Sequence, residues 1–354
     1  MRGTNSAHIV PTRSMKTQSD SMAWLTLSDG SRIIGRGPFT AAAQAPASST
    51  AFYVQDFALS DPKPWKIPHE AECVKAESLA DAKSSEPIEC EWQALDATPF
   101  SAVFQEIMTS IHSGGFEKTV PVVTETGVCK SAPIHAITGA MQCQRAPLHS
   151  YGWINGDSGF AGATPELLFS LDDHHLETMA LAGTARSEDH DVFAADEKEI
   201  REHEYVAQTL VSKLLDLGQL SRHPRSILNL GSIVHFLTRI TVKLHSPMPP
   251  EALIRKLHPT PALGPLPRTT ETMNQLIDWR KRLDCPAQFG APFGVLHNGR
   301  FEAIVAIRGI WFDGPHIRIP AGCGIIEASR LVNEWRELRL KRESVKNFLF
   351  HSNR

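Results

Sequence analysis

Two glutamate-rich segments carry the residues whose types and spacing best suit chemistry. The first runs from Glu197 to Glu204. In the second, Glu334, Glu337 and Lys341 recur at helical spacing, so they project from one face of a predicted helix. Two such acidic faces brought together, with a lysine beside them, would make a site for a hard cation that also holds an anionic ligand. On spacing alone, solvated helix surfaces with ion pairs four residues apart are the simpler interpretation.

A second chemical feature is a cation in an apolar setting. Arg308 lies in the run from Phe301 to Trp311, which predicts a strand. A cation there must be paired or must bind an anion. A buried structural ion pair is the alternative to an anion site. A glycine-rich turn, Ala321 to Ile325, follows, and glycine lets the backbone approach a ligand closely.

The elements that must position these residues are strands and long helices. Strands are predicted at 24–27, 32–34, 51–54, 118–123, 166–171, 177–181, 233–244, 289–296, 301–310 and 316–319, and helices at 100–112, 196–217, 250–257, 270–283 and 331–350. Residues 60–95, rich in Pro, Ser, Glu and Lys, indicate a mobile connection or a surface excursion. Long helices over antiparallel strands predict an α+β fold. No dinucleotide-binding or Walker motif occurs, so neither a dinucleotide nor ATP is indicated.

Composition excludes several classes of protein. The net charge of −3 and the lack of a basic stripe argue against nucleic acid as a partner. No apolar run is long enough to predict a membrane span. The six cysteines are scattered without a Cys-x-x-Cys pair, which makes a zinc site built from them a poor expectation, and we interpret them as reduced thiols of a cytoplasmic protein. We expect residues 1–21 to be a disordered leader, and residues 22–354 to form one domain.

Seven motifs in order carry a resemblance to a known family. They are Gly162–Leu168, Leu181–Arg186, Glu202-His203, Leu257–Leu263, Ala306–Gly309, Ala321–Ile325 and Glu334–Glu337. Together they resemble the chorismate-utilising enzymes, which include isochorismate, salicylate, anthranilate and aminodeoxychorismate synthases. The resemblance runs from about Lys118 to the C-terminus, roughly two-thirds of the chain. It implies a single domain of stacked antiparallel sheets covered by helices, the fold of anthranilate synthase component I, with chorismate bound at its centre beside Mg²⁺.

The resemblance also assigns roles to residues of this chain. It implies that Glu202 and Glu337 bind Mg²⁺ with support from Glu334, which agrees with the preference of this ion for one or two carboxylates. It makes Arg308 a clamp on the enolpyruvyl carboxylate and Lys341 a further charge for a substrate carboxylate. The remaining substrate-binding residues that it implies are Gly183, Thr184, His258, Thr260, Phe289, Gly322 and Gly324. A lone histidine is as often structural as functional, so His258 keeps both interpretations.

Two further residues decide the reaction class. Members of the family that use water as the nucleophile have lysine at the position of Lys118. A lysine of lowered pKa can deprotonate a water that attacks ring C2, and Glu166 can protonate the departing C4 hydroxyl if its pKa is raised. An exposed lysine and a surface carboxylate are the alternatives for these two positions.

The leading interpretation is therefore a magnesium-dependent isochorismate synthase that serves menaquinone or siderophore biosynthesis. Salicylate synthase, which goes on to eliminate pyruvate, is the nearest alternative, and a non-catalytic chorismate-binding protein is a more distant one. Lys118 disfavours an amine-forming relative, so we expect a monomer without a glutaminase subunit. Two departures from the family pattern stand near the site. Pro265 replaces a more usual glycine, and Cys323 replaces alanine, which predicts sensitivity to thiol reagents.

Overall fold

The computed structural model describes residues 21–75, 89–144 and 146–350. Residues 1–20 of the predicted leader lie outside the described residues, whereas Ser21 is the first residue of a strand. The described strands are β1 (Ser21–Thr26), β2 (Arg32–Ala42), β3 (Ala51–Val54), β4 (Trp65–Val74), β5 (Cys90–Trp92), β6 (Lys118–Thr119), β7 (Val122–Cys129), β8 (His149–Asn155), β9 (Ser158–Thr164), β10 (Leu167–Asp172), β11 (His175–Arg186), β12 (Gly218–Arg222), β13 (Ser226–Asn229), β14 (Ile233–Leu244), β15 (Pro292–His297), β16 (Arg300–Val305), β17 (Gly309–Asp313), β18 (His316–Gly322) and β19 (Ile325–Ile326).

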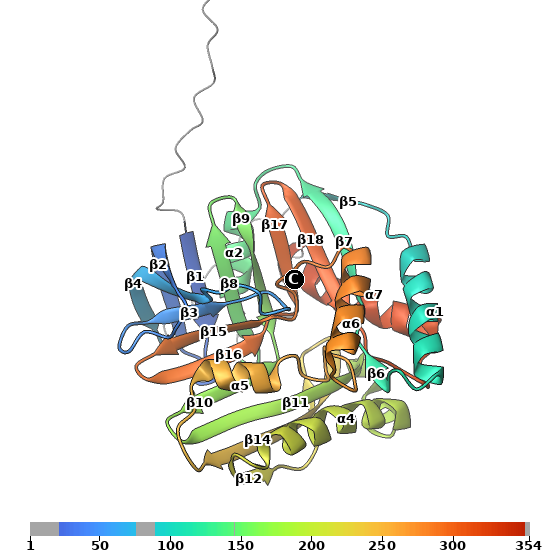
Figure 1. Ribbon diagram of the computed structural model, residues 1–354. Helices are drawn as coiled ribbons and strands as arrows, with labels where there is room; N and C mark the ends of the chain where they lie inside the picture. The colour runs from blue at the N-terminus through green and yellow to red at the C-terminus, as the bar shows by residue number, and fades with distance from the viewer. Residues whose placement is uncertain (1–20, 76–88, 145, 351–354) are drawn as a thin grey trace, which may run out of the picture.

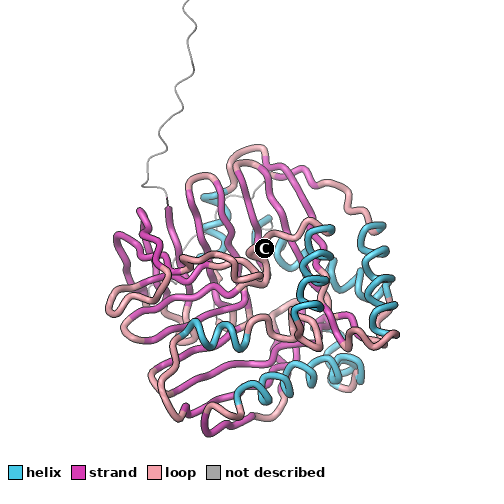
Figure 2. The backbone as a smooth tube through the Cα atoms, in the orientation of Figure 1, coloured by secondary structure: helices cyan, strands magenta, loops and turns pink. Residues whose placement is uncertain are grey.

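Helices surround these strands. They are α1 (Thr98–His112), α2 (Ile134–Gln142), α3 (His190–Ala194), α4 (Glu197–Leu214), α5 (Pro250–Leu257), α6 (Thr270–Arg282) and α7 (Leu331–Phe350). Helix α4 packs on β11 and β14, and α7 packs on β18 and α2. Figures 1 and 2 show α1, α6 and α7 grouped at one side of the strands. Within the described ranges, no helix is both long and apolar enough to cross a membrane.

Antiparallel pairing joins the strands into one continuous ladder. In the described part of the chain, seventeen strands belong to it, and β6 with β19 forms a separate pair. One half runs through β5, β7, β18, β17, β9, β8, β1 and β2. Strand β4 pairs with both β2 and β3 and leads into the other half, through β15, β16, β10, β11 and β14. The edge of β14 opposite β11 carries β12 and β13.

The two halves pack against each other through aromatic side chains. Phe293 of β15 lies 5.8 Å, between ring centroids, from both Tyr151 of β8 and Phe160 of β9. Since β15 belongs to one half of the ladder and β8 and β9 to the other, these rings form a core between the halves. The expected α+β domain of antiparallel sheets and helices is confirmed.

Several element boundaries differ from the prediction. The single strand predicted at 301–310 is divided into β16 and β17, because Arg308 adopts a φ of 55°, outside the extended region. The strand predicted at 118–123 is likewise divided into β6 and β7 around Pro121, which has no N–H to donate. The segment 60–95, interpreted as a connection or excursion, contributes β4 and β5 to the ladder.

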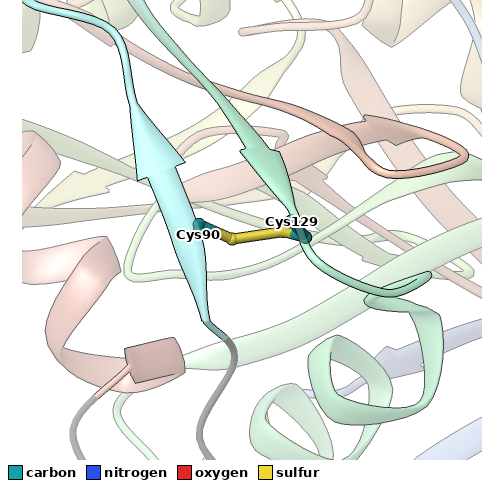
Figure 3. The surroundings of a disulfide bond; sticks show 2 residues. All are labelled: Cys90 and Cys129. Atoms are coloured by element: carbon teal, nitrogen blue, oxygen red, sulfur yellow. A yellow bond between two sulfur atoms is a disulfide. The ribbon is translucent and has the colours of Figure 1, made fainter.

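The prediction of six reduced thiols is wrong for two of them. Cys90 of β5 and Cys129 of β7 form a disulfide (Figure 3). They are directly opposite partners on antiparallel strands, with Cα atoms 4.1 Å apart. Because 39 residues separate them along the chain, the pairing depends on the register of β5 with β7, which spacing alone does not reveal.

Candidate active site

A cavity lies where α4, α7, β11, β18 and the break between β16 and β17 meet. It is lined by ten of the residues that the sequence analysis singled out: Glu166, Gly183, Thr184, Glu202, Phe289, Arg308, Gly322, Gly324, Glu337 and Lys341. Lys118 and Thr260 are buried and contact lining residues, and Glu334 is buried one helical turn before the lining residue Glu337. The structure therefore gathers residues from distant parts of the sequence into one site.

One wall of the cavity is acidic. Asp196 caps α4 by accepting a hydrogen bond from the backbone N–H of Glu199 at 3.1 Å, and this fixes the start of the helix. Glu199 and Glu202, three residues apart, lie on the same face of α4 and are both buried. Glu334 and Glu337 come from α7, again three residues apart. We call these four side chains the glutamate cluster.

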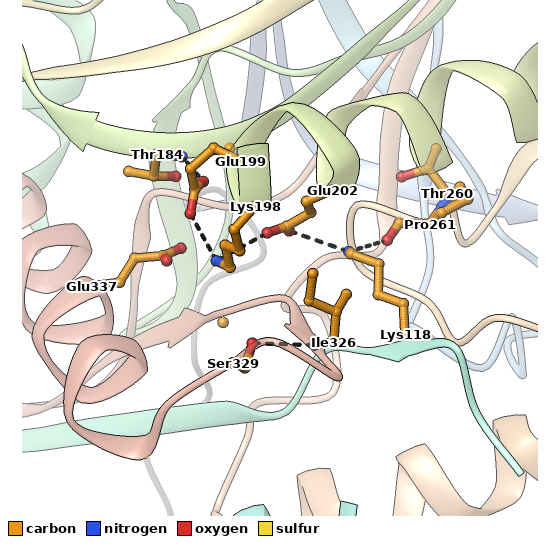
Figure 4. Close-up of polar contacts among 12 residues, drawn as sticks. Lys118, Thr184, Lys198, Glu199, Glu202, Thr260, Pro261, Ile326, Ser329 and Glu337 are labelled. Atoms are coloured by element: carbon orange, nitrogen blue, oxygen red, sulfur yellow. Dashed lines mark hydrogen bonds and ion pairs between the residues drawn. The ribbon is translucent and has the colours of Figure 1, made fainter. Parts of the chain in front are cut away.

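Lys198 lies within the glutamate cluster (Figure 4). Its Nζ is 2.7 Å from Glu199 Oε1, 3.4 Å from Glu202 Oε2 and 3.5 Å from Glu334 Oε1. Burial lowers the pKa of Lys198, but the surrounding carboxylates, Glu202 foremost, outweigh it and raise the pKa well above its usual value. The sequence analysis missed both Lys198 and Glu199, although they lie within the segment it highlighted.

Two carboxyl groups of the cluster, those of Glu199 and Glu334, have raised pKa values. Burial, followed by the charge of Glu202, raises the pKa of Glu199 to about 7. Burial, followed by the charge of Glu337, raises the pKa of Glu334 to about 8. Burial is thus the main cause of both shifts, and the charge of a neighbouring carboxylate adds to each.

The glutamate cluster has the donor chemistry for a hard cation. Glu334 Oε2 is buried without a hydrogen-bond partner, an oxygen that a metal or its water would satisfy. Across the described ranges, no three acidic, histidine or cysteine side chains are gathered closely enough to hold a metal as they stand. Magnesium needs only one or two carboxylates when waters and substrate complete its shell, so Glu202 and Glu337 fit it.

Lys118 is enclosed behind the acidic wall. Its side chain is 0% exposed, and its Nζ lies 3.4 Å from Glu202 Oε1 and donates a hydrogen bond to the carbonyl of Pro261. Burial lowers the pKa of Lys118, although the charge of Glu202 opposes the shift. Gly324 makes room for this arrangement, because a Cβ atom there would lie 2.0 Å from Glu202 Oε1 and 3.0 Å from Lys118 Cε.

Glu166 precedes β10 and lines the cavity. Burial raises its pKa to about 7, against the opposing effect of a hydrogen bond from Thr260 Oγ1 at 3.3 Å. A carboxyl group with this pKa is still about half protonated at neutral pH. Thr260 and Pro261 are consecutive residues, so one loop holds both Glu166 and Lys118.

The wall that carries Arg308 is cationic, and the hydrogen-bond partners of this arginine are neutral side chains. Arg308 donates to His235 Nε2 and to Ser344 Oγ, each at 2.9 Å. Since His235 Nε2 accepts this bond, its Nδ1 carries the proton and donates to the carbonyl of Gly183 at 2.6 Å. Among the described residues, no carboxylate forms a salt bridge with Arg308, and burial lowers its pKa to about 10. This cation has only neutral hydrogen-bond partners and suits an anionic ligand.

Lys341 adds a second cation, bonded to Glu337 at 2.5 Å and to the carbonyl of Gly322 at 2.9 Å. His235 was not predicted as a site residue. It lies within the predicted apolar strand 233–244, where no pattern distinguishes it from a core residue.

His258 and Cys323 are buried near the site but lie outside the lining of the cavity. His258 is 2% exposed, does not line the cavity, and bonds through Nε2 to the carbonyl of Phe57 at 2.9 Å. Burial lowers its pKa to about 3, so it is a neutral, structural side chain. Cys323 is fully buried among apolar residues of α1 and α7, and burial raises its pKa well above the usual value. The expectation of a reactive thiol at Cys323 is therefore wrong.

The fold and cavity define an enzyme-like site in which buried carboxyl groups of one wall face the cations Arg308 and Lys341 of the lining. Residues 44–350 match the family described as chorismate binding enzymes, and the chain belongs to that family. The chain is 28% identical over 272 residues to isochorismate synthase MenF of Haemophilus influenzae, and 31% identical over 199 residues to isochorismate synthase EntC of Escherichia coli. These matches cover 72% and 52% of this chain, and 61% and 50% of the two relatives' own lengths.

A solved structure shares the fold. The menaquinone-specific isochorismate synthase MenF of Escherichia coli superposes with a TM-score of 0.80 at 20% identity, covering 94% of this chain and 90% of that one.

Proposed function

We propose that the protein is a magnesium-dependent isochorismate synthase that converts chorismate to isochorismate. The observation that carries this proposal is the placement of Glu166, which lines the cavity, and Lys118, which contacts the lining residue Glu202, both held by the consecutive residues Thr260 and Pro261. Burial lowers the pKa of Lys118 and raises that of Glu166 to about 7. A base and an acid tuned in opposite directions are what the exchange of one hydroxyl for another requires. Membership of the chorismate-binding family and the relatives named above support the choice of substrate and reaction.

The cationic side of the cavity would hold the substrate. Chorismate carries two carboxylates, and Arg308 and Lys341 are the cations that line the cavity. Arg308 would clamp one carboxylate, since its guanidinium is already oriented by His235 and Ser344. Gly322 and Gly183 also line the cavity, so backbone could approach the ligand there without a side chain intervening.

The glutamate cluster would hold the metal. Glu202 and Glu337 are the proposed ligands, and Glu334 would support the site through its unpartnered Oε2. When bound, Mg²⁺ would fix the ring carboxylate of the substrate and offset its charge. The protein's own contribution here is orientation, because both ligands come from helices whose positions are set by packing on β11 and β18.

In the reaction, Lys118 would take a proton from a water whose oxygen bonds to ring C2. Glu166 would give its proton to the C4 hydroxyl, which leaves as water while the ring double bonds shift. One water enters and one leaves, so the net change is an isomerisation. Neutral Lys118 would accept a hydrogen bond from the attacking water through its lone pair while it still donates to the Pro261 carbonyl.

Product analysis tests the proposal. The full-length protein is incubated with chorismate and Mg²⁺, with EDTA in a parallel reaction, and the products are separated by liquid chromatography. We expect a mixture of chorismate and isochorismate with Mg²⁺ and no conversion with EDTA. Salicylate and pyruvate, absent without enzyme, would assign the chain to salicylate synthesis instead. No turnover, also with ammonium added, would overturn the proposal.

A further inference from the structure

We propose that Lys198 is a built-in counter-ion of the glutamate cluster, which occupies the cation position and must leave it when Mg²⁺ binds. Lys198 would therefore set the affinity of the site for the metal. The inference rests on the proposed metal dependence but concerns a residue that this proposal does not use.

The contacts of Lys198 are those of a bound cation. Its ammonium group is within 3.5 Å of carboxylate oxygens from Glu199, Glu202 and Glu334, which belong to two different helices. Because four carboxyl groups are brought together at this wall, they repel one another when no cation lies among them. A lysine side chain in this position stabilises the metal-free protein.

The position of Lys198 also conflicts with that of a metal. Glu202 is a proposed ligand, and its Oε2 is in contact with Lys198 at 3.4 Å. Mg²⁺ takes oxygen ligands at about 2.1 Å and brings waters with it, so an ammonium group cannot share the same carboxylate oxygens at its present distance. Binding of the metal must therefore break at least part of the Lys198 network.

An exit for Lys198 is visible in the structure. An open chamber outside the cavity is lined by Lys198 together with Glu199, Glu334 and Glu337 of the cluster. The same chamber is lined by Asp196, a carboxylate that could receive the displaced ammonium group. The side chain of Lys198 is 22% exposed, whereas that of Lys118 is 0% exposed.

The other two lysines of the site are better anchored. Lys341 is bonded to the Gly322 carbonyl and Lys118 to the Pro261 carbonyl, whereas the ion-pair partners of Lys198 among the described residues are all carboxylates. Lys198 is thus the cation whose contacts a divalent ion would replace most completely.

The test measures metal binding without substrate. Mg²⁺ is titrated calorimetrically into the metal-free wild-type protein and into the variants Lys198→Met, Lys198→Gln and Lys198→Arg. Lys213→Met is a matched control, because Lys213 is a partly buried lysine in the last turn of the same helix. Thermal unfolding with and without Mg²⁺ provides a second readout for each protein.

We expect Lys198→Met and Lys198→Gln to bind Mg²⁺ about tenfold more tightly than wild type, as loss of one competing ion pair predicts. Without metal, both variants should have a lower Tm than wild type. Addition of Mg²⁺ should raise their Tm by more than it raises that of wild type. Lys198→Arg, which keeps the charge, should remain close to wild type, as should Lys213→Met.

Two results would overturn the inference in distinguishable ways. If wild type binds Mg²⁺ but Lys198→Met and Lys198→Gln bind it equally or more weakly, Lys198 does not compete with the metal. If wild type and every variant fail to bind Mg²⁺, the metal-dependent part of the proposed function fails as well. Since two uncharged variants are used, misfolding of one leaves the other to decide.

Discussion

The acidic and cationic walls of the cavity bury charge in opposite ways. The glutamate cluster contains its own cation, Lys198, and the carboxyl groups of Glu199 and Glu334 still have raised pKa values. Arg308, by contrast, is oriented by the neutral groups of His235 and Ser344 and carries a lowered pKa. Lys198 therefore offsets part of the negative charge of the acidic wall before any ligand binds. The positive charge of Arg308 is held in a fixed orientation but has no carboxylate salt-bridge partner among the described residues.

This difference has a physical consequence for binding. A ligand of the acidic wall must displace existing contacts, so its affinity reflects a competition. A ligand of Arg308 meets a guanidinium that is already dehydrated and fixed, so little has to rearrange. Four predictions distinguish the roles of the two walls from each other and from those of the structural residues around them.

The largest effect is expected at Glu166, which stands between the two walls. Glu166→Gln should lower kcat by about 10³-fold, because the variant has no proton to give to the leaving group. Steady-state rates of isochorismate formation provide the measurement. Glu302→Gln is a matched control, since burial also raises the pKa of Glu302 to about 7 but it lies outside the cavity lining. Equal losses in both variants would contradict a specific role for Glu166.

Removal of the Arg308 guanidinium from the cationic wall should have the second largest effect on activity. Arg308→Met should reduce kcat/KM by about 100-fold, mainly through KM, because charge-assisted bonds to a substrate carboxylate are lost. Ser344→Ala, which removes one support of Arg308, should have a smaller effect in the same direction. Kinetics with varied chorismate tests both variants. An unchanged KM in Arg308→Met would show that this wall does not bind the substrate.

The pH dependence of kcat/KM should provide a third test, because it reports the ionisation of Glu166 and Lys118. Glu166 acts only when protonated, so with a pKa of about 7 its active fraction falls as pH rises above that value. The pH profile of kcat/KM at saturating Mg²⁺ should therefore decline by about tenfold per unit on its alkaline side. The lowered pKa of Lys118, which acts when neutral, sets the acidic limb. A profile that rises steadily through pH 9 would exclude Glu166 as the acid.

The smallest effect on activity is expected at His258. His258→Ala should destabilise the fold by about 2 kcal/mol, because the Phe57 carbonyl loses its partner and a small cavity remains. Its kcat/KM should stay within about threefold of wild type, as for a change outside the reacting groups. Urea unfolding and steady-state kinetics measure the two quantities. A large kinetic loss at native stability would return His258 to the active site.

Much of the fold could be predicted because apolar periodicity survives in the sequence. Strand β14 and helices α5 and α7 have the predicted bounds. The predicted strand bounds that differ from the structure do so for local reasons, which an apolar pattern does not reveal. The apolar run around Arg308 continues through a left-handed residue that divides it into two strands, and β4 contains a proline and four charged or histidine side chains that interrupt its apolar pattern.

The candidate site was predictable to the extent that its residues lie in ordered motifs. Glu202, Arg308 and Glu337 were identified by such motifs and line one cavity. Lys198 and His235 were missed for physical reasons. A lysine in a glutamate-rich helix is ordinarily a surface residue, and only tertiary packing turns it inward. A histidine in an apolar strand acquires a role only through the partners that the fold brings to it.

One short loop has a further consequence for how the enzyme could be altered. Thr260 holds Glu166 and the carbonyl of Pro261 holds Lys118, so the proposed acid and base share a single tether. A displacement of this loop would shift both groups together and preserve their relative position. Residues inserted between Thr260 and Pro261 would instead separate the two, so the tolerance of the enzyme to change should be unusually low at that one peptide bond.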